Sequence, residues 1–195
     1  MFFNRLAKRD TPFQLVVGMT GVKLGDRVLQ VGCAHGGRLA AIAGKVGLSG
    51  RAVVIVADPA SAARAEKASA QAGVLVEVET APSTTLPVDD GSFDLAVVDD
   101  TGSAFSALSE ADRAATIREL ARIVRPGGRA MIIGVTPRKG LASLISKGAD
   151  TPSLAASGEA ATALDAGGFR GSRTLAEREG LVFVEGIKPR ANAHT

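Results

Sequence analysis

Short apolar runs alternate with helical stretches along most of this chain, and this alternation constrains the fold more than any other feature. Seven runs have the length and composition of strands, at residues 27–31, 52–57, 75–79, 95–98, 130–134, 171–175 and 181–185. The run at 52–57 (AVVIVA) is wholly apolar, as expected for a strand buried on both faces of a parallel sheet. Strands that alternate with helices predict an α/β fold.

The segments between these runs have apolar residues at helical spacing. Helices are predicted around residues 39–46, 60–72, 109–124 and 159–166. Ser109 is placed to cap the third helix, and Gly47 to end the first. We expect the Pro-Gly-Gly turn at 126–128 to break the chain before the fifth strand. A polar turn at 176–180 separates the last two strands, which predicts an antiparallel hairpin.

Together these elements predict a doubly wound, three-layer αβα domain with a seven-stranded, mostly parallel sheet that ends in the antiparallel hairpin. The 195 residues suit one domain, with an N-terminal helical segment at 1–20 and a core at 21–190. Phe2, Phe3 and Leu6 lie among basic residues and predict an amphipathic helix. This helix either packs on the domain, covers a ligand cleft or touches a membrane.

Composition argues against several classes of function. The net charge is only +3, and aromatic residues make up 4% with no Trp or Tyr, so nothing indicates a nucleic-acid surface. Cys33 is the only cysteine, which rules out an intramolecular disulfide, and with only His35 and His194 beside it a zinc site is not expected. No apolar run is long enough to cross a bilayer. We expect a cytoplasmic protein.

The turn after the first strand carries the strongest signal for a ligand. Residues 32–37 (GCAHGG) are small and lead into a helix N-terminus, which favours polar or anionic groups. Asp58 follows the second strand, 26 residues after Gly32, close to the roughly 20 expected for an acid that binds ribose hydroxyls. Alternatively, Asp58 and Pro59 simply begin the next helix. The turn and the acid together favour a nucleoside-bearing ligand.

Three segments in this order and spacing resemble the class I S-adenosylmethionine-dependent methyltransferases. Residues 28–36 (VLQVGCAHG) are similar to the first motif of that family, V-L-D-V-G-C-G-x-G. Residues 86–95 (LPVDDGSFDL) resemble the segment before the fourth strand, and residues 119–129 (ELARIVRPGGR) the helix and turn before the fifth. The resemblance implies a Rossmann-like core and S-adenosylmethionine as the cofactor.

The resemblance also implies how the cofactor is held. Asp58 would hold the ribose hydroxyls, and Thr80 with Ala81 would border the adenine. The candidate cofactor-binding residues are Gln30, Gly32, Cys33, Ala34, His35, Gly36, Asp58, Pro59, Thr80, Ala81 and Asp99. Three of them depart from the family pattern, because Gln30 and Thr80 replace acids and Ala34 replaces a glycine.

Other interpretations of these segments stay open. The glycine-rich turn also fits a loose dinucleotide fingerprint, and hence a nicotinamide oxidoreductase. Cys33 is either a packed small residue or a nucleophile, and His35 is either an exposed loop residue or a general base. Asp99 and Asp100 follow the fourth strand at the edge where such sheets bind ligands. They either contact the ligand, with Asp99 as the candidate, or form a solvated acidic loop, Asp100 especially; no metal site is expected.

The function predicted from these residues is methyl transfer to an unidentified small-molecule acceptor, with no catalytic base evident. The alternative is a catalytically degenerate binding or scaffold protein, which the departures at Gln30, Ala34 and Thr80 motivate. A protein partner or a homodimer is compatible with either function.

Overall fold

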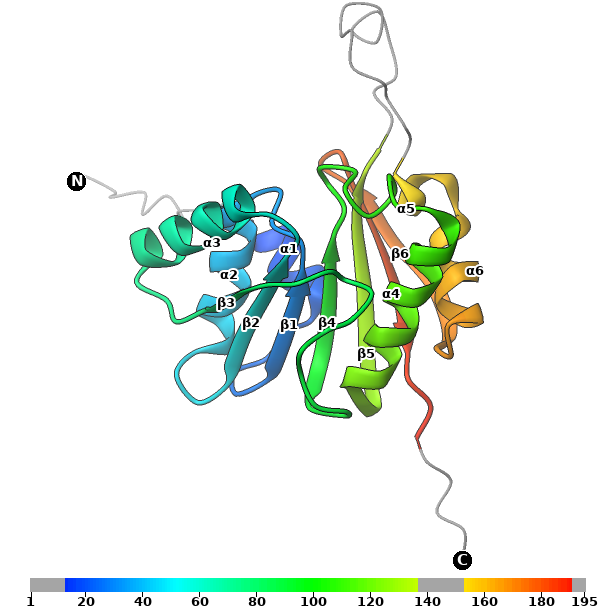
Figure 1. Ribbon diagram of the computed structural model, residues 1–195, viewed down its shortest axis with the longest axis horizontal. Coiled ribbons are helices and arrows are strands. Elements are labelled where there is room, and N and C mark those ends of the chain that lie inside the picture. Colours follow the sequence, from blue (N-terminus) through cyan, green and yellow to red (C-terminus); the bar gives the residue numbers. More distant parts are fainter. Residues whose placement is uncertain (1–12, 137–152, 191–195) are drawn as a thin grey trace, which may run out of the picture.

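A seven-stranded sheet between two layers of helices forms the part of the chain that the computed structural model describes, residues 13–136 and 153–190 (Figure 1). The strands are β1 (Arg27–Val31), β2 (Arg51–Val56), β3 (Glu77–Thr80), β4 (Phe93–Asp99), β5 (Val124–Val135), β6 (Arg170–Arg178) and β7 (Leu181–Ile187). The helices are α1 (Gln14–Thr20), α2 (Gly36–Val46), α3 (Pro59–Ala72), α4 (Glu110–Ile123), α5 (Leu154–Ser157) and α6 (Glu159–Ala166).

The strand order is β3-β2-β1-β4-β5-β7-β6. The first five strands in this order pair in parallel, and β7 is antiparallel to both of its neighbours. This arrangement confirms the predicted fold class. The chain leaves β1 toward β2 on one side and returns with β4 on the other, so the order reverses between β1 and β4. In open α/β sheets, ligands bind at such a reversal, beyond the carboxyl ends of the strands.

Each face of the sheet is buried by its own set of helices. Helices α1, α2 and α3 cover one face, where Ile42 and Val46 of α2 belong to the same buried cluster as Val97 of β4. Helices α4, α5 and α6 cover the other face, where Ile117 and Leu120 of α4 are almost fully buried. The central strands therefore bury both faces, as the apolar run at 52–57 predicted.

We expected the Pro-Gly-Gly turn at 126–128 to break the chain before the fifth strand, but these residues form a bulge inside β5. Phe93 pairs with Val124 and Leu95 pairs with Arg129, so residues 125–128 of β5 lie opposite the single residue Asp94 of β4. Gly127 has a φ of 78°, and its N–H donates to Lys188 O. Pairing with the segment after β7 therefore continues through the turn, and the strand is longer than predicted.

The C-terminal hairpin is confirmed, with a tighter turn than predicted. Strand β6 continues through Arg178, and only Glu179 and Gly180 connect it to β7, both with positive φ. Two residues of this conformation make the hairpin turn that matches the twist of paired strands. Residues 137–152, which follow β5, lie outside the described residues, as do Phe2, Phe3 and Leu6. The described part of the predicted N-terminal helical segment is α1.

Candidate functional site

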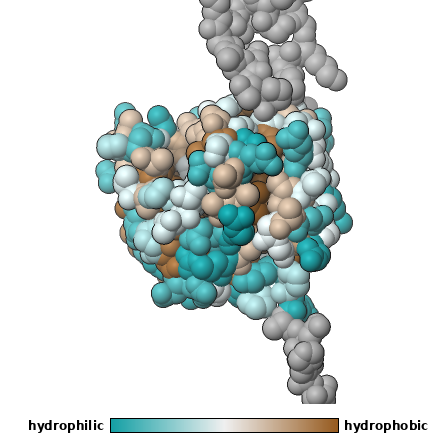
Figure 2. All heavy atoms as spheres, turned by 45° about the vertical axis from the view of Figure 1, so that its right-hand side comes forward, coloured by the Kyte–Doolittle hydropathy of each residue, from teal (hydrophilic) through white to brown (hydrophobic). Residues whose placement is uncertain are grey.

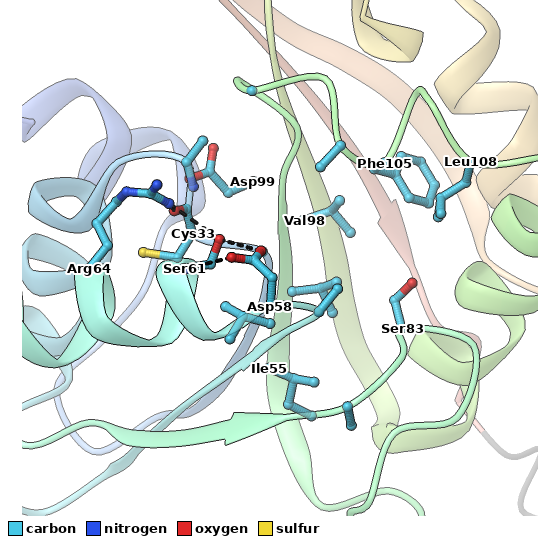
Figure 3. A pocket seen from close by; sticks show the side chains of 18 residues that line it. Cys33, Ile55, Asp58, Ser61, Arg64, Ser83, Val98, Asp99, Phe105 and Leu108 are labelled. Carbon is cyan, nitrogen blue, oxygen red and sulfur yellow. Dashed lines mark hydrogen bonds between the residues drawn. The ribbon is translucent and has the colours of Figure 1, made fainter.

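A cavity of about 360 Å³ lies at the carboxyl ends of β1, β2 and β4, where the strand order reverses. Figure 3 shows Cys33 and Arg64 at one end of it and Ser83, Phe105 and Leu108 at the other, with Asp58 between them. The volume falls in the range of small-molecule sites. We call the end with Cys33 and Arg64 the loop end, and the end with Ser83, Phe105 and Leu108 the apolar end.

Asp99, the last residue of β4, holds the glycine-rich loop in place. Its side chain is buried, and its Oδ2 accepts hydrogen bonds from the backbone N–H of Ala34 at 3.0 Å and of His35 at 3.4 Å. Its Oδ1 accepts from the Thr101 hydroxyl at 2.6 Å and lies 3.7 Å from the Arg38 guanidinium. All of these donors belong to the chain itself, so Asp99 shapes the cavity wall rather than standing free in it.

Two glycines allow neighbouring backbone segments to lie close together at the loop end of the cavity. Gly32 has a φ of 80°, and a Cβ there would lie 3.2 Å from the Asp99 carbonyl oxygen. Gly102 faces Ala34, and a Cβ at Gly102 would lie 3.0 Å from the Ala34 methyl. The methyl group that Ala34 adds to the family pattern is therefore accommodated by a glycine on the facing loop.

The start of α3 presents an acid and a cation to the cavity. Asp58 caps the helix, since its carboxylate accepts hydrogen bonds from Ser61 N at 2.8 Å and Ser61 Oγ at 2.7 Å. These bonds from Ser61 lower the pKa of Asp58 below its ordinary value. Arg64 donates to Cys33 O at 2.6 Å, which ties α3 to the glycine-rich loop. Asp58 thus caps the helix, as one interpretation of the sequence predicted, and it also lines the cavity, so its role toward ribose hydroxyls stays a prediction.

Helix α4 supports both loops of the apolar end. The loop after β3 is held by a Thr116–Ser83 hydroxyl contact of 2.9 Å and by Glu119, whose carboxylate accepts from Leu86 N at 2.7 Å. The loop after β4 is held by Arg113, which donates to Leu108 O at 2.6 Å. The walls of the apolar end therefore share one supporting helix.

Asp100 organises the loop after β4 from inside. It is fully buried, and its Oδ1 accepts from Phe105 N at 3.0 Å and Ser106 N at 2.9 Å, while its Oδ2 accepts from the Ser106 hydroxyl. Burial raises the pKa of Asp100 above its ordinary value. The interpretation of Asp100 as part of a solvated loop is therefore wrong, because its carboxylate replaces water as the partner of these donors.

The structure gathers six of the eleven candidate residues in the cavity wall: Gly32, Cys33, Ala34, Asp58, Ala81 and Asp99. The other five lie beside it and have local contacts. Gln30 donates to Gly32 O at 2.8 Å, and His35 caps α2 by accepting from Gly37 N through Nδ1. Gly36 packs on α3, where a Cβ would lie 2.9 Å from Arg64 O. Pro59 is the first residue of α3, and Thr80 is exposed at the end of β3.

Several residues of the cavity were not predicted from the sequence. Ser61 and Arg64 follow Asp58 by three and six residues, and helical spacing could have placed them on the same side of α3 as the cavity. Ser83, Phe105 and Leu108 lie in loops with no periodic pattern. No sequence signal could have identified them.

Cys33 is predicted to react slowly with thiol reagents. Burial, reinforced by the nearby Asp99 carboxylate, raises its pKa from 9.0 to about 11. At pH 8 we expect iodoacetamide to label it about 100-fold more slowly than in the unfolded chain, because the thiolate is the reactive form. Mass spectrometry in the presence and absence of urea measures this rate on the chain's single cysteine. Equal rates would mean that Cys33 is an accessible nucleophile.

Within residues 13–136 and 153–190, no group of three or more His, Cys, Asp or Glu side chains is arranged to hold a metal ion. The same residues include no helix with the length and hydropathy needed to cross a bilayer. On the face shown in Figure 2, hydrophobic atoms form small separate areas among hydrophilic ones.

Comparison with known proteins identifies the family. A family model described as a methyltransferase domain matches residues 28–128, just over half of the chain and the whole of the segment that forms the cavity's loop end. The chain belongs to this methyltransferase family. The match includes the first two motifs on which the resemblance rested and all but the last residue of the third. S-adenosylmethionine is the cofactor that the family implies.

Individual relatives agree with this family assignment. A ubiquinone/menaquinone biosynthesis C-methyltransferase, UbiE, from Hahella chejuensis is 29% identical over 80% of this chain and 59% of its own length. A methyltransferase structure from Aquifex aeolicus has a TM-score of 0.73, with 23% identity over 91% of this chain and 89% of that one. A chain from the complex of the Haloferax volcanii Trm112 methyltransferase activator with a methyltransferase has a TM-score of 0.65 at 20% identity, over 92% and 89%. The chain spans 29% to 59% of the length of the first curated relatives.

The residues of the cavity fit the cofactor that the family implies. The loop end allows close backbone approach at Gly32, Asp58 offers an exposed carboxylate between the two ends, and the apolar end offers Phe105 and Leu108. A nucleoside with a polar tail has the same division, with a flat base, a diol and a charged end. The donor set and the shape therefore agree with S-adenosylmethionine.

Proposed function

We propose that this chain transfers the methyl group of S-adenosylmethionine to a small-molecule acceptor. The cavity at the strand reversal, with Asp58 exposed in its wall beside the glycine-rich loop, is the observation that carries the proposal. The name of the UbiE relative, a C-methyltransferase of quinone biosynthesis, supports an acceptor of small-molecule size.

In this proposal the methyltransferase acts mainly by alignment. The cofactor, when bound, supplies a methyl group that its sulfonium already makes electrophilic. Asp58 would hold the ribose hydroxyls, since a carboxylate accepts two hydrogen bonds from a diol. The backbone of residues 32–34 would border the polar tail, and Asp99 would keep that backbone in position. Holding donor and acceptor in reacting geometry lowers the barrier without a dedicated base.

The arrangement of acids and histidine supports alignment rather than acid–base catalysis. Asp99 is occupied by donors of the chain itself, and His35 uses Nδ1 to cap α2. Asp100 is buried beneath the loop after β4. Among the described residues that line the cavity, Asp58 alone is an exposed acid, and its pKa is lowered, which makes it a weak base.

A single substitution at Asp58 tests the proposal. Calorimetric titration is expected to show micromolar binding of S-adenosylhomocysteine to the wild-type chain and binding at least about tenfold weaker to Asp58→Asn, because a charged acceptor of the diol becomes neutral. Asparagine is as good an N-cap as aspartate, so α3 keeps its start and the loss reports on the ligand.

The matched control for this titration is Glu110→Gln at the first residue of α4, another acid at a helix start that lies outside the cavity wall. It should bind like the wild type. No binding to the wild-type chain at millimolar cofactor, or unchanged binding to Asp58→Asn, would contradict the proposal.

The alternative of a degenerate binding module is not favoured by the comparisons. The structure accounts for the three departures that motivated it: Gln30 supports the loop by donating to Gly32 O, Gly102 makes room for Ala34, and Thr80 lies outside the cavity wall.

We also propose a cytoplasmic location, which the unpaired Cys33 supports. A protein partner is supported only by the activator complex among the structural neighbours.

A further inference from the structure

We infer that Ser83 selects the base of the ligand and that its hydroxyl is oriented for this purpose by Thr116. The inference rests on the proposed function, because it concerns the base of the cofactor in the same cavity. Ser83 lies in the loop after β3, at the apolar end of the cavity (Figure 3). The position that the family pattern gives to the base-contacting acid is Thr80, which lies outside the wall.

Ser83 is the polar group best placed to contact a base. The polar side chains of the described cavity wall are Cys33, Asp58, Ser61, Arg64, Ser83 and Asp99. All except Ser83 lie near the loop end or the start of α3, while Ser83 shares its end with Phe105 and Leu108 (Figure 3). A flat base between apolar walls would therefore find one hydroxyl along its edge.

The direction of the hydrogen bonds at Ser83 follows from the helix behind it. Thr116 is fully buried in α4, and its hydroxyl lies 2.9 Å from Asp112 O and 2.9 Å from Ser83 Oγ. A carbonyl can only accept, so the single proton of Thr116 is donated to Asp112 O. Thr116 must then accept at the other contact, and the proton of Ser83 is donated to it.

Ser83 is therefore left with lone pairs and no proton for the cavity. It can accept a hydrogen bond from a ligand but cannot donate one. The 6-amino group of adenine is a donor, whereas hypoxanthine has a carbonyl oxygen at the same position. A base with an oxygen there would leave two acceptors facing each other without a proton, and sites built around a hydrogen bond reject such analogues strongly.

The test compares two ligands that differ only in this group, S-adenosylhomocysteine and S-inosylhomocysteine, by calorimetric titration. We expect the wild-type chain to prefer the adenine form by about tenfold or more, and Ser83→Ala by about threefold or less. The ratio is the readout, because a general loosening of the loop would weaken both ligands equally and leave the ratio unchanged.

Two variants of Thr116 test the orientation of the hydroxyl. Thr116→Val has the same shape but no acceptor, so the Ser83 proton is free to turn toward a ligand oxygen, and the preference for adenine should fall although Ser83 is present. Thr116→Ser keeps the hydroxyl that accepts the Ser83 proton, so this variant should prefer the adenine ligand by the same ratio as the wild type. Thermal unfolding of each variant checks that the fold is intact.

The outcomes separate this inference from the proposed function. Tight binding of S-adenosylhomocysteine with the wild-type ratio retained in Ser83→Ala or in Thr116→Val overturns the inference and leaves the proposed function standing. Failure of the wild-type chain to bind S-adenosylhomocysteine overturns the proposed function, and the inference with it.

Discussion

Asp99→Ala is expected to reduce binding of S-adenosylhomocysteine by at least about 100-fold and to lower the free energy of unfolding by about 3–5 kcal/mol. The substitution leaves the N–H groups of Ala34 and His35 without their acceptor and removes the carboxylate facing Arg38. Buried donors without a partner are costly, and these donors form the loop that borders the ligand. Titration calorimetry and urea unfolding measure the two effects.

Asp99→Asn is the informative comparison for this position. One side-chain oxygen becomes an NH₂ group, which must face either the backbone N–H groups of the glycine-rich loop or the Thr101 backbone N–H and the Arg38 guanidinium. Either orientation places donors against donors, so most of the loss should persist. Wild-type affinity in Asp99→Asn would show that the loop does not depend on this carboxylate.

Asp100→Ala is expected to lower the free energy of unfolding by about 2–4 kcal/mol, because Phe105 N and Ser106 N lose their buried acceptor. Phe105 lines the apolar end, so affinity for the cofactor should fall as well. Asp100→Asn should stay within about 1 kcal/mol of the wild type, since its oxygen still accepts from both N–H groups and its NH₂ can donate to the Ser106 hydroxyl. Urea unfolding at pH 7 measures all three chains.

The pH dependence of stability provides a second check on Asp100. Burial raises its pKa, so the folded chain takes up this proton at a higher pH than the unfolded chain does. The free energy of unfolding of the wild type, relative to that of Asp100→Asn, should therefore fall as the pH rises from about 4 through the raised pKa. A relative stability that rises over this range would mean that the fold stabilises the charged carboxylate better than water does in the unfolded chain.

Asp99 and Asp100 show which features of the site could be predicted from the sequence and which could not. Their place at the end of β4 was predictable, because it follows from an apolar strand and the edge at which parallel strands end. Their roles were not, because successive residues of a strand point to opposite sides and meet different loops. The amide substitution is expected to be harmful at one and tolerated at the other, a difference that only the contacts explain.

The fold was predictable for a similar reason. Buried strands and amphipathic helices carry periodic patterns, and the strands and the final hairpin appeared where those patterns placed them. The bulge in β5 was missed because it depends on pairing with Lys188, more than 50 residues away. The loop end of the cavity followed from local motifs, while the apolar end depends on loops whose positions are set by tertiary contacts with α4.

Those contacts with α4 couple ligand recognition to the hydrophobic core. Ile117 and Leu120 lie on the buried face of the helix that holds Ser83 through Thr116 and Leu108 through Arg113. Any ligand that steadies the two loops must, by linkage, also steady this helix on the sheet. The affinity of the cavity for a ligand therefore depends on aliphatic residues that never touch the ligand, and the site extends in this sense into the interior of the protein.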